Sequence, residues 1–119
     1  MNIDHIVISV KDIKKSEKFY NSFLGKSRKA KEDISWKLGS TKFFITYPYK
    51  KTPRSFDKSN IGLNHIAFRI DSKKQLESYC KRLIKAQIPN SGIKIDKYSK
   101  KEFIWFDDPD GVRLEFYLR

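Results

Sequence analysis

The chain repeats one pattern after 60 residues, and its only two histidines stand at the same place in the two copies. The first copy opens at residues 4–10 (DHIVISV) and the second at residues 64–70 (NHIAFRI). The match continues at the same offset, where FY and FL at 19–20 and 23–24 align with YC and LI at 79–80 and 83–84. A repeat of this kind predicts two modules of the same build, related by a pseudo-two-fold axis.

Hydrophobic periodicity predicts the same order of elements in each copy. In the first copy we expect a strand at 2–10, a helix from Ser16 to Leu24 that Gly25 ends, with Asp12 as a candidate cap, and strands at 34–38 and 43–47. In the second copy we expect a strand at 63–70, a helix capped by Ser72 and running to Ala86, strands at 93–98, 103–106 and 112–118, and a turn at 107–111. Each module is therefore expected to be β-α-β-β with room for one more short strand.

These elements predict an α+β fold in one domain that spans residues 1–119. The first module covers about 1–48 and the second about 61–119. The polar segment at about 49–60, which contains Pro53, is expected to connect them.

The composition suits a globular protein with a strongly positive surface. The chain has 26 Lys and Arg against 14 Asp and Glu, a net charge of +12, and 39% hydrophobic residues. Dispersed lysine is typical of a solvated surface, although a positive potential also attracts anionic small molecules. The basic residues form no single stripe and no nucleic-acid-binding motif is visible, so we expect no nucleic-acid partner. No apolar run has the length of a membrane span, so no membrane association is expected.

Two features predict a cytoplasmic location. The N-terminal residues enter a strand pattern at once, without the charged and apolar regions of a signal peptide. Cys80 is the only cysteine, so an internal disulfide cannot form.

Three side chains are the candidate site. Strand alternation places His5 on one face with Val7 and Ser9, and His65 on one face with Ala67 and Arg69. Glu115 lies between Leu114 and Phe116, which we expect to pack against the helices, so Glu115 faces the other side of its sheet. Alignment of the last strands places Glu115 at the position that Phe44 holds in the first module.

Two imidazoles and one carboxylate, with coordination positions left over, suit a divalent metal ion that also binds substrate oxygens. If the modules face each other, His5, His65 and Glu115 converge. The alternative is structural: each histidine is a hydrogen-bonded core residue, and Glu115 pairs with Arg113 or Arg69. Residue types alone leave both interpretations open.

The repeated histidine starts, the residues at 19–25 (FYNSFLG) and the ending at 108–115 (DPDGVRLE) resemble the vicinal oxygen chelate superfamily. This superfamily includes glyoxalase I, fosfomycin-resistance enzymes, bleomycin-resistance proteins and extradiol dioxygenases. The resemblance covers essentially the whole chain. It implies two βαβββ modules that form a half-open barrel around a metal, usually in a homodimer. It also implies that His5, His65 and Glu115 hold the metal, which is Mn, Fe, Ni, Co or Zn, and that Glu115 is the catalytic carboxylate.

The departures from the family pattern limit the choice of activity. Glyoxalase I usually has a fourth ligand, Glu or Gln, where this chain has Phe44. Fosfomycin enzymes usually have threonine two residues after the first histidine, where this chain has Val7. Extradiol dioxygenases keep further acid–base histidines, and this chain has no third histidine. Bleomycin-binding members hold a cationic drug, which a chain of net charge +12 would repel.

Two functions remain. The first is a metal-dependent enzyme, a lyase, transferase or dioxygenase, that acts on a small, oxygen-rich, anionic substrate. The second is a metal-free protein of the bleomycin-resistance type that binds a small molecule or antibiotic, in which the histidines only form hydrogen bonds. Four aromatic residues are candidates for lining the cleft: Trp36, Tyr47, Tyr98 and Trp105.

Overall fold

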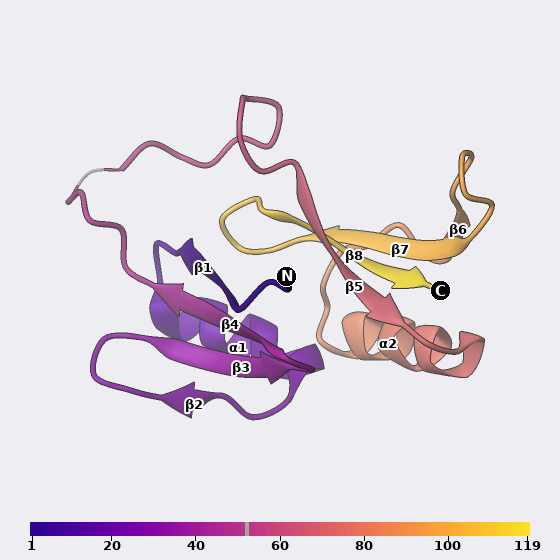
Figure 1. Cartoon of the computed structure of the whole chain (residues 1–119), viewed down its shortest axis with the longest axis horizontal. Coiled ribbons are helices and arrows are strands. Elements are labelled where there is room, and N and C mark those ends of the chain that lie inside the picture. The colour runs from indigo at the N-terminus through magenta and orange to yellow at the C-terminus, as the bar shows by residue number, and fades with distance from the viewer. Residues whose placement is uncertain (52) are drawn as a thin grey trace. The chain divides into compact units, whose positions relative to one another are not determined.

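The computed structural model describes residues 1–51 and 53–119; Thr52, which falls in the expected connection, lies outside them. The chain divides into two compact units, Met1–Ser55 (unit 1) and Phe56–Arg119 (unit 2). Each unit has one four-stranded sheet and one long helix (Figure 1). Within the described residues, no helix has the length and hydropathy needed to cross a lipid bilayer.

Unit 1 is a βαβββ module. Its elements in chain order are β1 (His5–Ser9), α1 (Ile13–Leu24), β2 (Arg28–Lys29), β3 (Ile34–Leu38) and β4 (Thr41–Thr46). The strands lie in the order β1-β4-β3-β2, with β1 parallel to β4 and the other pairs antiparallel.

Unit 2 repeats this plan. Its elements are β5 (His65–Ile70), α2 (Lys73–Lys85), β6 (Lys94–Ile95), β7 (Glu102–Asp107) and β8 (Arg113–Leu118). The strand order is β5-β8-β7-β6, again with only the first pair parallel. His5 and His65 are thus the first residues of equivalent strands. The predicted α+β class and the predicted repeat of two modules are confirmed, and the short strand β2 completes the βαβββ order of unit 1.

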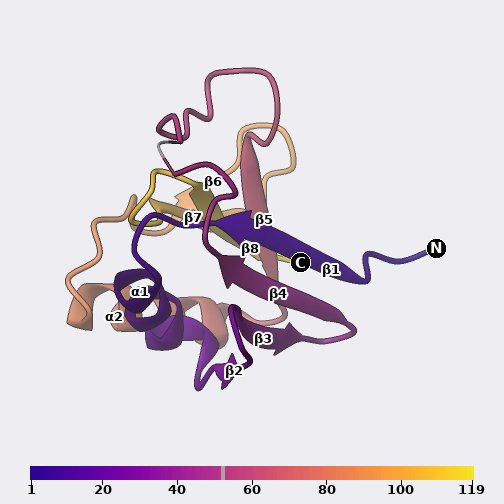
Figure 2. The same ribbon diagram turned by 90° about the vertical axis from the view of Figure 1, so that its left-hand side faces the viewer.

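Each helix covers one face of its own sheet. Helix α1 packs on the sheet of unit 1, to one side of β4 and β3 (Figure 2), and α2 packs on β5 and β8. The side chains between helix and sheet are the core. In unit 1 the fully buried ones include Tyr20, Phe23, Phe43 and Ile45, and in unit 2 they include Leu76, Leu83, Ile104, Phe106, Leu114 and Phe116. The opposite face of each sheet carries no helix of its own unit, and this helix-free face bears the candidate site residues.

Local hydrogen bonds explain where the elements differ from the sequence prediction. Helix α1 begins at Ile13, not Ser16, because the Asp12 carboxylate caps it by accepting from the Lys15 N–H at 3.1 Å. The strand expected at 93–98 was wrong beyond residue 95. The Asp96 carboxylate accepts from the N–H groups of Tyr98 and Ser99, which bends the chain into a turn.

The turn predicted at 107–111 is confirmed, and it fixes the start of β8. The buried carboxylate of Asp108 accepts from the N–H groups of Asp110 and Val112, both at 2.9 Å. Gly111 has φ of +88°, which residues with a side chain rarely adopt. This turn reverses the chain so that β8 pairs antiparallel with β7 and parallel with β5.

Candidate metal centre

Glu115 lies in the middle of the helix-free face of unit 2. In the sheet it stands between Ala67 of β5 and Trp105 of β7. Its sequence neighbours Leu114 and Phe116 are 0% and 1% exposed in the core on the other face, as strand alternation predicted. The Glu115 side chain is only 15% exposed, so its carboxylate is largely shielded from bulk water.

His65 faces this carboxylate. The distance from His65 Nε2 to Glu115 Oε2 is 3.7 Å, which is too long for a direct hydrogen bond. The residue paired with Glu115 on β5 is Ala67, whose methyl group leaves the space beside the carboxylate to the imidazole of His65.

The residue before each histidine fixes the proton on the imidazole. Asn64 Oδ1 lies 2.7 Å from His65 Nδ1, and Asp4 Oδ2 lies 2.7 Å from His5 Nδ1. Both oxygens accept these hydrogen bonds, so Nδ1 is the donor, and in the neutral imidazole the lone pair is left on Nε2. A hydrogen bond at one ring nitrogen that orients the other toward an ion is the usual support of a metal-binding histidine.

Sequence reasoning missed these two supporting residues. The signal was present, since the repeat aligns Asp4 with Asn64, each with an oxygen-bearing side chain directly before the histidine. The hydrogen bond from His5 also holds the pKa of the Asp4 carboxyl below its usual value, with a smaller contribution from the charge of Lys42.

The donor atoms of unit 2 fit a divalent metal ion. With a neutral imidazole, His65 Nε2 and Glu115 Oε2 both offer lone pairs, and both could bind a divalent cation held between them. Ligand atoms at roughly 2.0–2.2 Å from a common ion lie at most about 4.4 Å apart. The observed 3.7 Å falls within that reach, and one nitrogen with one carboxylate oxygen is a donor set that Mn, Fe, Co, Ni and Zn accept.

The third predicted ligand, His5, belongs to unit 1. It begins β1 on the helix-free face of that unit, beside Lys42 of β4. Within either unit, the described residues gather no group of three or more His, Cys, Asp or Glu side chains close enough for one ion. The structure therefore brings together His65 and Glu115, and the three-ligand set with His5 stays a prediction.

The structural alternative for Glu115 finds no support in unit 2. Arg113 donates through Nε to Asp107 Oδ1 at 2.6 Å, and Arg69 donates through Nε to Asp71 Oδ1 at 2.9 Å. Both arginines thus pair with other carboxylates. The side chain that does face the Glu115 carboxylate within unit 2 is His65, with Nε2 3.7 Å from Oε2.

Four aromatic residues were candidates for lining the cleft, and for Trp36 this prediction was wrong. It is 3% exposed on the helix-covered face of unit 1, and its indole N–H is shared between Asn21 Oδ1 and the Gly25 carbonyl, both at 3.1 Å. Trp105 lies on the face of Glu115 and directly beside it, and its role in lining a cleft stays a prediction. Tyr98 is 84% exposed in the turn after β6.

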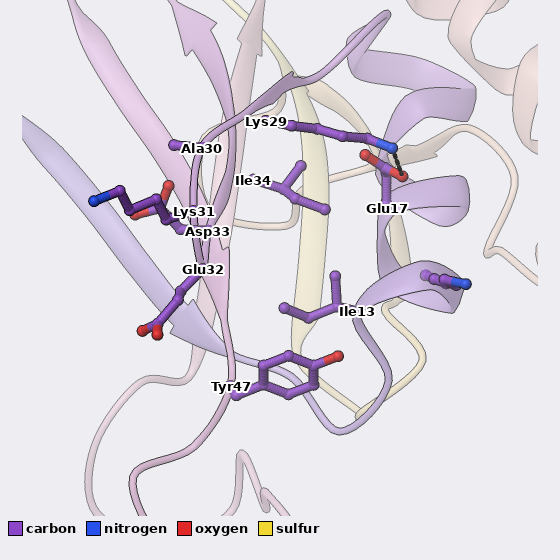
Figure 3. Close-up of a pocket in the computed structure, with 10 residues that line it drawn as sticks. Ile13, Glu17, Lys29, Ala30, Lys31, Glu32, Asp33, Ile34 and Tyr47 are labelled. Carbon is purple, nitrogen blue, oxygen red and sulfur yellow. Dashed lines mark ion pairs between the residues drawn. The ribbon is translucent and has the colours of Figure 1, made fainter.

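Tyr47 lines a cavity that does not lie on the face of the candidate site. This cavity, of about 230 Å³, lies in unit 1 between the start of α1 and the segment at 29–34. The side chains of Ile13, Ile34 and Tyr47 extend into it, and the Glu17–Lys29 ion pair borders it (Figure 3). Ile34 pairs with Ile45, a core residue, so this cavity is on the helix-covered side of the sheet, away from the face that carries His5.

Known proteins share the sequence pattern and the fold of this chain. The profile of the Glyoxalase/Bleomycin resistance protein/Dioxygenase superfamily matches residues 2–116. The YaeR protein of Escherichia coli (strain K12) is 29% identical over 97% of this chain and 94% of its own length. The metallothiol transferase FosB of Lysinibacillus sphaericus (strain C3-41) is 28% identical over 98% of this chain and 81% of its own.

A solved structure agrees with these sequence matches. The crystal structure of the glyoxalase family protein from Enterococcus faecalis is 26% identical and superposes with a TM-score of 0.78. The match covers 98% of this chain and 96% of that one.

Proposed function

Because the chain belongs to the Glyoxalase/Bleomycin resistance protein/Dioxygenase superfamily, we propose that it is a metal-dependent enzyme that acts on a small, oxygen-rich, anionic substrate. His5, His65 and Glu115 are the proposed metal ligands. The observation that carries the proposal is the pair His65 Nε2 and Glu115 Oε2 at 3.7 Å, with His65 Nδ1 held by Asn64.

The proposed ligands differ in the charge that they bring to the site. As ligands, the two histidines would contribute no charge and Glu115 would contribute one negative charge, so a divalent ion held by them would keep a net positive charge. Such an ion, when bound, acts as a Lewis acid that stabilises negative charge on a substrate oxygen. Glu115 sets how much of that charge is left for the substrate, and its shielded position in the middle of the sheet limits competition from water.

Phe44 supports a ligand set of three. It holds the position in unit 1 that Glu115 holds in unit 2, since Phe44 pairs with Val7 of β1 as Glu115 pairs with Ala67 of β5. A phenyl ring donates no electron pair to these metals, so water or substrate would complete the coordination of a bound ion. This favours a chemistry in which the substrate binds the metal directly. The similarity to FosB, a metallothiol transferase, makes thiol transfer the first activity to assay.

The direct test is metal-dependent stabilisation of the purified protein. After removal of metals with a chelator, the melting temperature is measured with Mn, Fe(II), Ni, Co or Zn for the wild type, His5→Ala and His65→Ala. We expect at least one metal to raise the melting temperature of the wild type and both variants to lose most of that rise. If metals leave the wild type unchanged, the enzyme proposal fails and a metal-free binding protein is favoured. If only His65→Ala loses the rise, His5 is not a ligand.

We also propose that the protein is a homodimer, as the family resemblance implies. Light scattering at micromolar concentration should give twice the chain mass of 14.1 kDa. A monomer under these conditions would contradict the proposed assembly without bearing on the metal ligands.

A further inference from the structure

The positively charged side chain of Arg113 is held in a fixed position beside the His65–Glu115 pair. Arg113 stands next to His65 in the sheet and two residues before Glu115, on the same strand face. Its guanidinium carbon lies 4.1 Å from the centre of the Trp105 ring. Trp105 pairs directly with Glu115 across β7 and β8, so the guanidinium covers the aromatic ring adjacent to the proposed metal ligand.

The guanidinium keeps donors for a ligand. Arginine has five N–H donors in a planar fork, and in the described part of unit 2 only the Nε–H of Arg113 has a carboxylate partner, Asp107 Oδ1 at 2.6 Å. The Arg113 side chain is 23% exposed, so part of it is open to solvent. Lys58 Nζ lies 3.7 Å from the other Asp107 oxygen, so Arg113, Lys58 and Asp107 together carry one net positive charge.

Unit 1 has a cation at the equivalent position. Lys42 pairs with His5 on β1 as Arg113 pairs with His65 on β5. Each candidate metal-binding histidine therefore has a basic side chain next to it on the neighbouring strand. This repeated placement favours an anionic ligand over a cationic or neutral one.

We propose that Arg113, held by Trp105 and Asp107, binds the anionic group of the substrate, a carboxylate or a phosphoryl-type oxyanion. The planar fork of arginine matches the paired oxygens of both groups. The inference rests on the proposed function for what the anion is attached to, and it adds the residue that recognises the charge. Trp105 and Asp107 are positioning residues, because they fix the plane of the guanidinium without contacting the ligand.

Arg69 is a matched control. It lies on the same helix-free face and also donates through Nε to an aspartate, Asp71, at 2.9 Å. Its side chain is 72% exposed, against 23% for Arg113. Arg69→Met therefore removes the same charge from the same face without touching the proposed subsite.

The experiment uses nuclear magnetic resonance on the metal-free chain of 119 residues. Acetate and inorganic phosphate are titrated separately at constant ionic strength, with chloride as the balancing anion. The Nε–H signals of Arg113 and Trp105 shift when an anion binds at this site. They therefore distinguish binding at Arg113 from weak association with surface lysines. A preference for acetate or for phosphate assigns the class of the anionic group.

In the wild type we expect saturable shifts of both signals. Arg113→Met, read from the Trp105 signal, should bind the anion at least about tenfold more weakly, because it loses a charge-assisted contact. Arg113→Lys, which keeps the charge, should bind with intermediate affinity, and Arg69→Met should bind like the wild type. The proposal is overturned if no saturable shift occurs, if Arg113→Met and Arg113→Lys both bind as well as the wild type, or if Arg69→Met weakens binding equally. Metal binding is measured in parallel, so a wild type that binds metal but shows no saturable anion binding refutes this inference alone.

Discussion

The ring of Phe44 meets the imidazole of His5 edge to face, with 6.0 Å between the ring centroids. Phe44 also holds the place in β4 that Glu115 holds in β8, as the pairing with β1 and β5 shows. An apolar ring thus stands beside the candidate ligand of unit 1 where unit 2 has a carboxylate.

Phe44→Glu should tighten metal binding by at least about tenfold, or about 1.4 kcal/mol, because it adds a second anionic ligand beside His5. Calorimetric titration with Mn or Zn measures the change. Phe44→Ala is the control, since it removes the ring without adding a donor and should not tighten binding. If Phe44→Glu folds but binds metal no better than Phe44→Ala, Phe44 does not border the metal.

Asn64→Ala should weaken metal binding by about 10- to 100-fold, the usual cost of removing the hydrogen-bond partner of a metal-binding histidine. Without Asn64, His65 Nδ1 loses its acceptor at 2.7 Å and the proton can move to Nε2. Asn64→Asp, which reproduces the Asp4–His5 pair of unit 1, should keep the affinity. Nitrogen chemical shifts of the imidazole give a readout without metal: the wild type should carry its proton on Nδ1, and an Nε2–H signal in the wild type would refute the assignment.

Asp96 should make the stability depend on pH in the acid range. The N–H groups of Tyr98 and Ser99 donate to its carboxylate, and with a smaller contribution from the Tyr117 hydroxyl they hold its pKa below the usual 3.8. A carboxyl whose pKa is lowered by folding stabilises the folded state above its unfolded pKa, and this stabilisation is lost as the pH falls through the folded value.

Asp96→Asn should therefore lower the melting temperature at neutral pH, and the difference from the wild type should shrink as the pH falls below 3.8. Thermal unfolding over this range measures it. Glu77→Gln, at an exposed position of α2, should melt like the wild type at neutral pH. A difference for Asp96→Asn that stays constant down to the lowest pH would show that the charge of Asp96 is not responsible.

The repeat made most of the fold predictable. The same hydrophobic spacing at two places required two equivalent modules, and strand alternation alone placed Glu115 opposite Leu114 and Phe116. The strand predicted at 93–98 failed because side-chain hydrogen bonds of Asp96 compete with strand pairing, which hydrophobic spacing does not report.

Of the candidate site, the sequence predicted the approach of His65 to Glu115 but not the side chains around them. The sequence does not show whether an aromatic residue of a strand lies on the helix-covered face or on the helix-free face, so Trp36 was predicted on the wrong one. Its burial and its hydrogen bonds to Asn21 and Gly25 place it on the helix-covered face. The roles of Asn64 and Arg113 depend on which side chains meet across strands, and one sequence does not supply that information.

Metal stoichiometry of the wild type and Glu115→Gln, after exposure to Mn, Fe, Ni, Co and Zn, tests the proposed metal centre. Glu77→Gln is the control for loss of a carboxylate. Glu115 is the only anionic ligand proposed, and its loss should cost more than loss of a supporting hydrogen bond, which costs about 10- to 100-fold. We predict about one ion per chain for the wild type and Glu77→Gln, consistent with one full ligand set per chain, and negligible metal in Glu115→Gln. Equal occupancy in all three proteins, or none in any, would contradict the proposed metal centre.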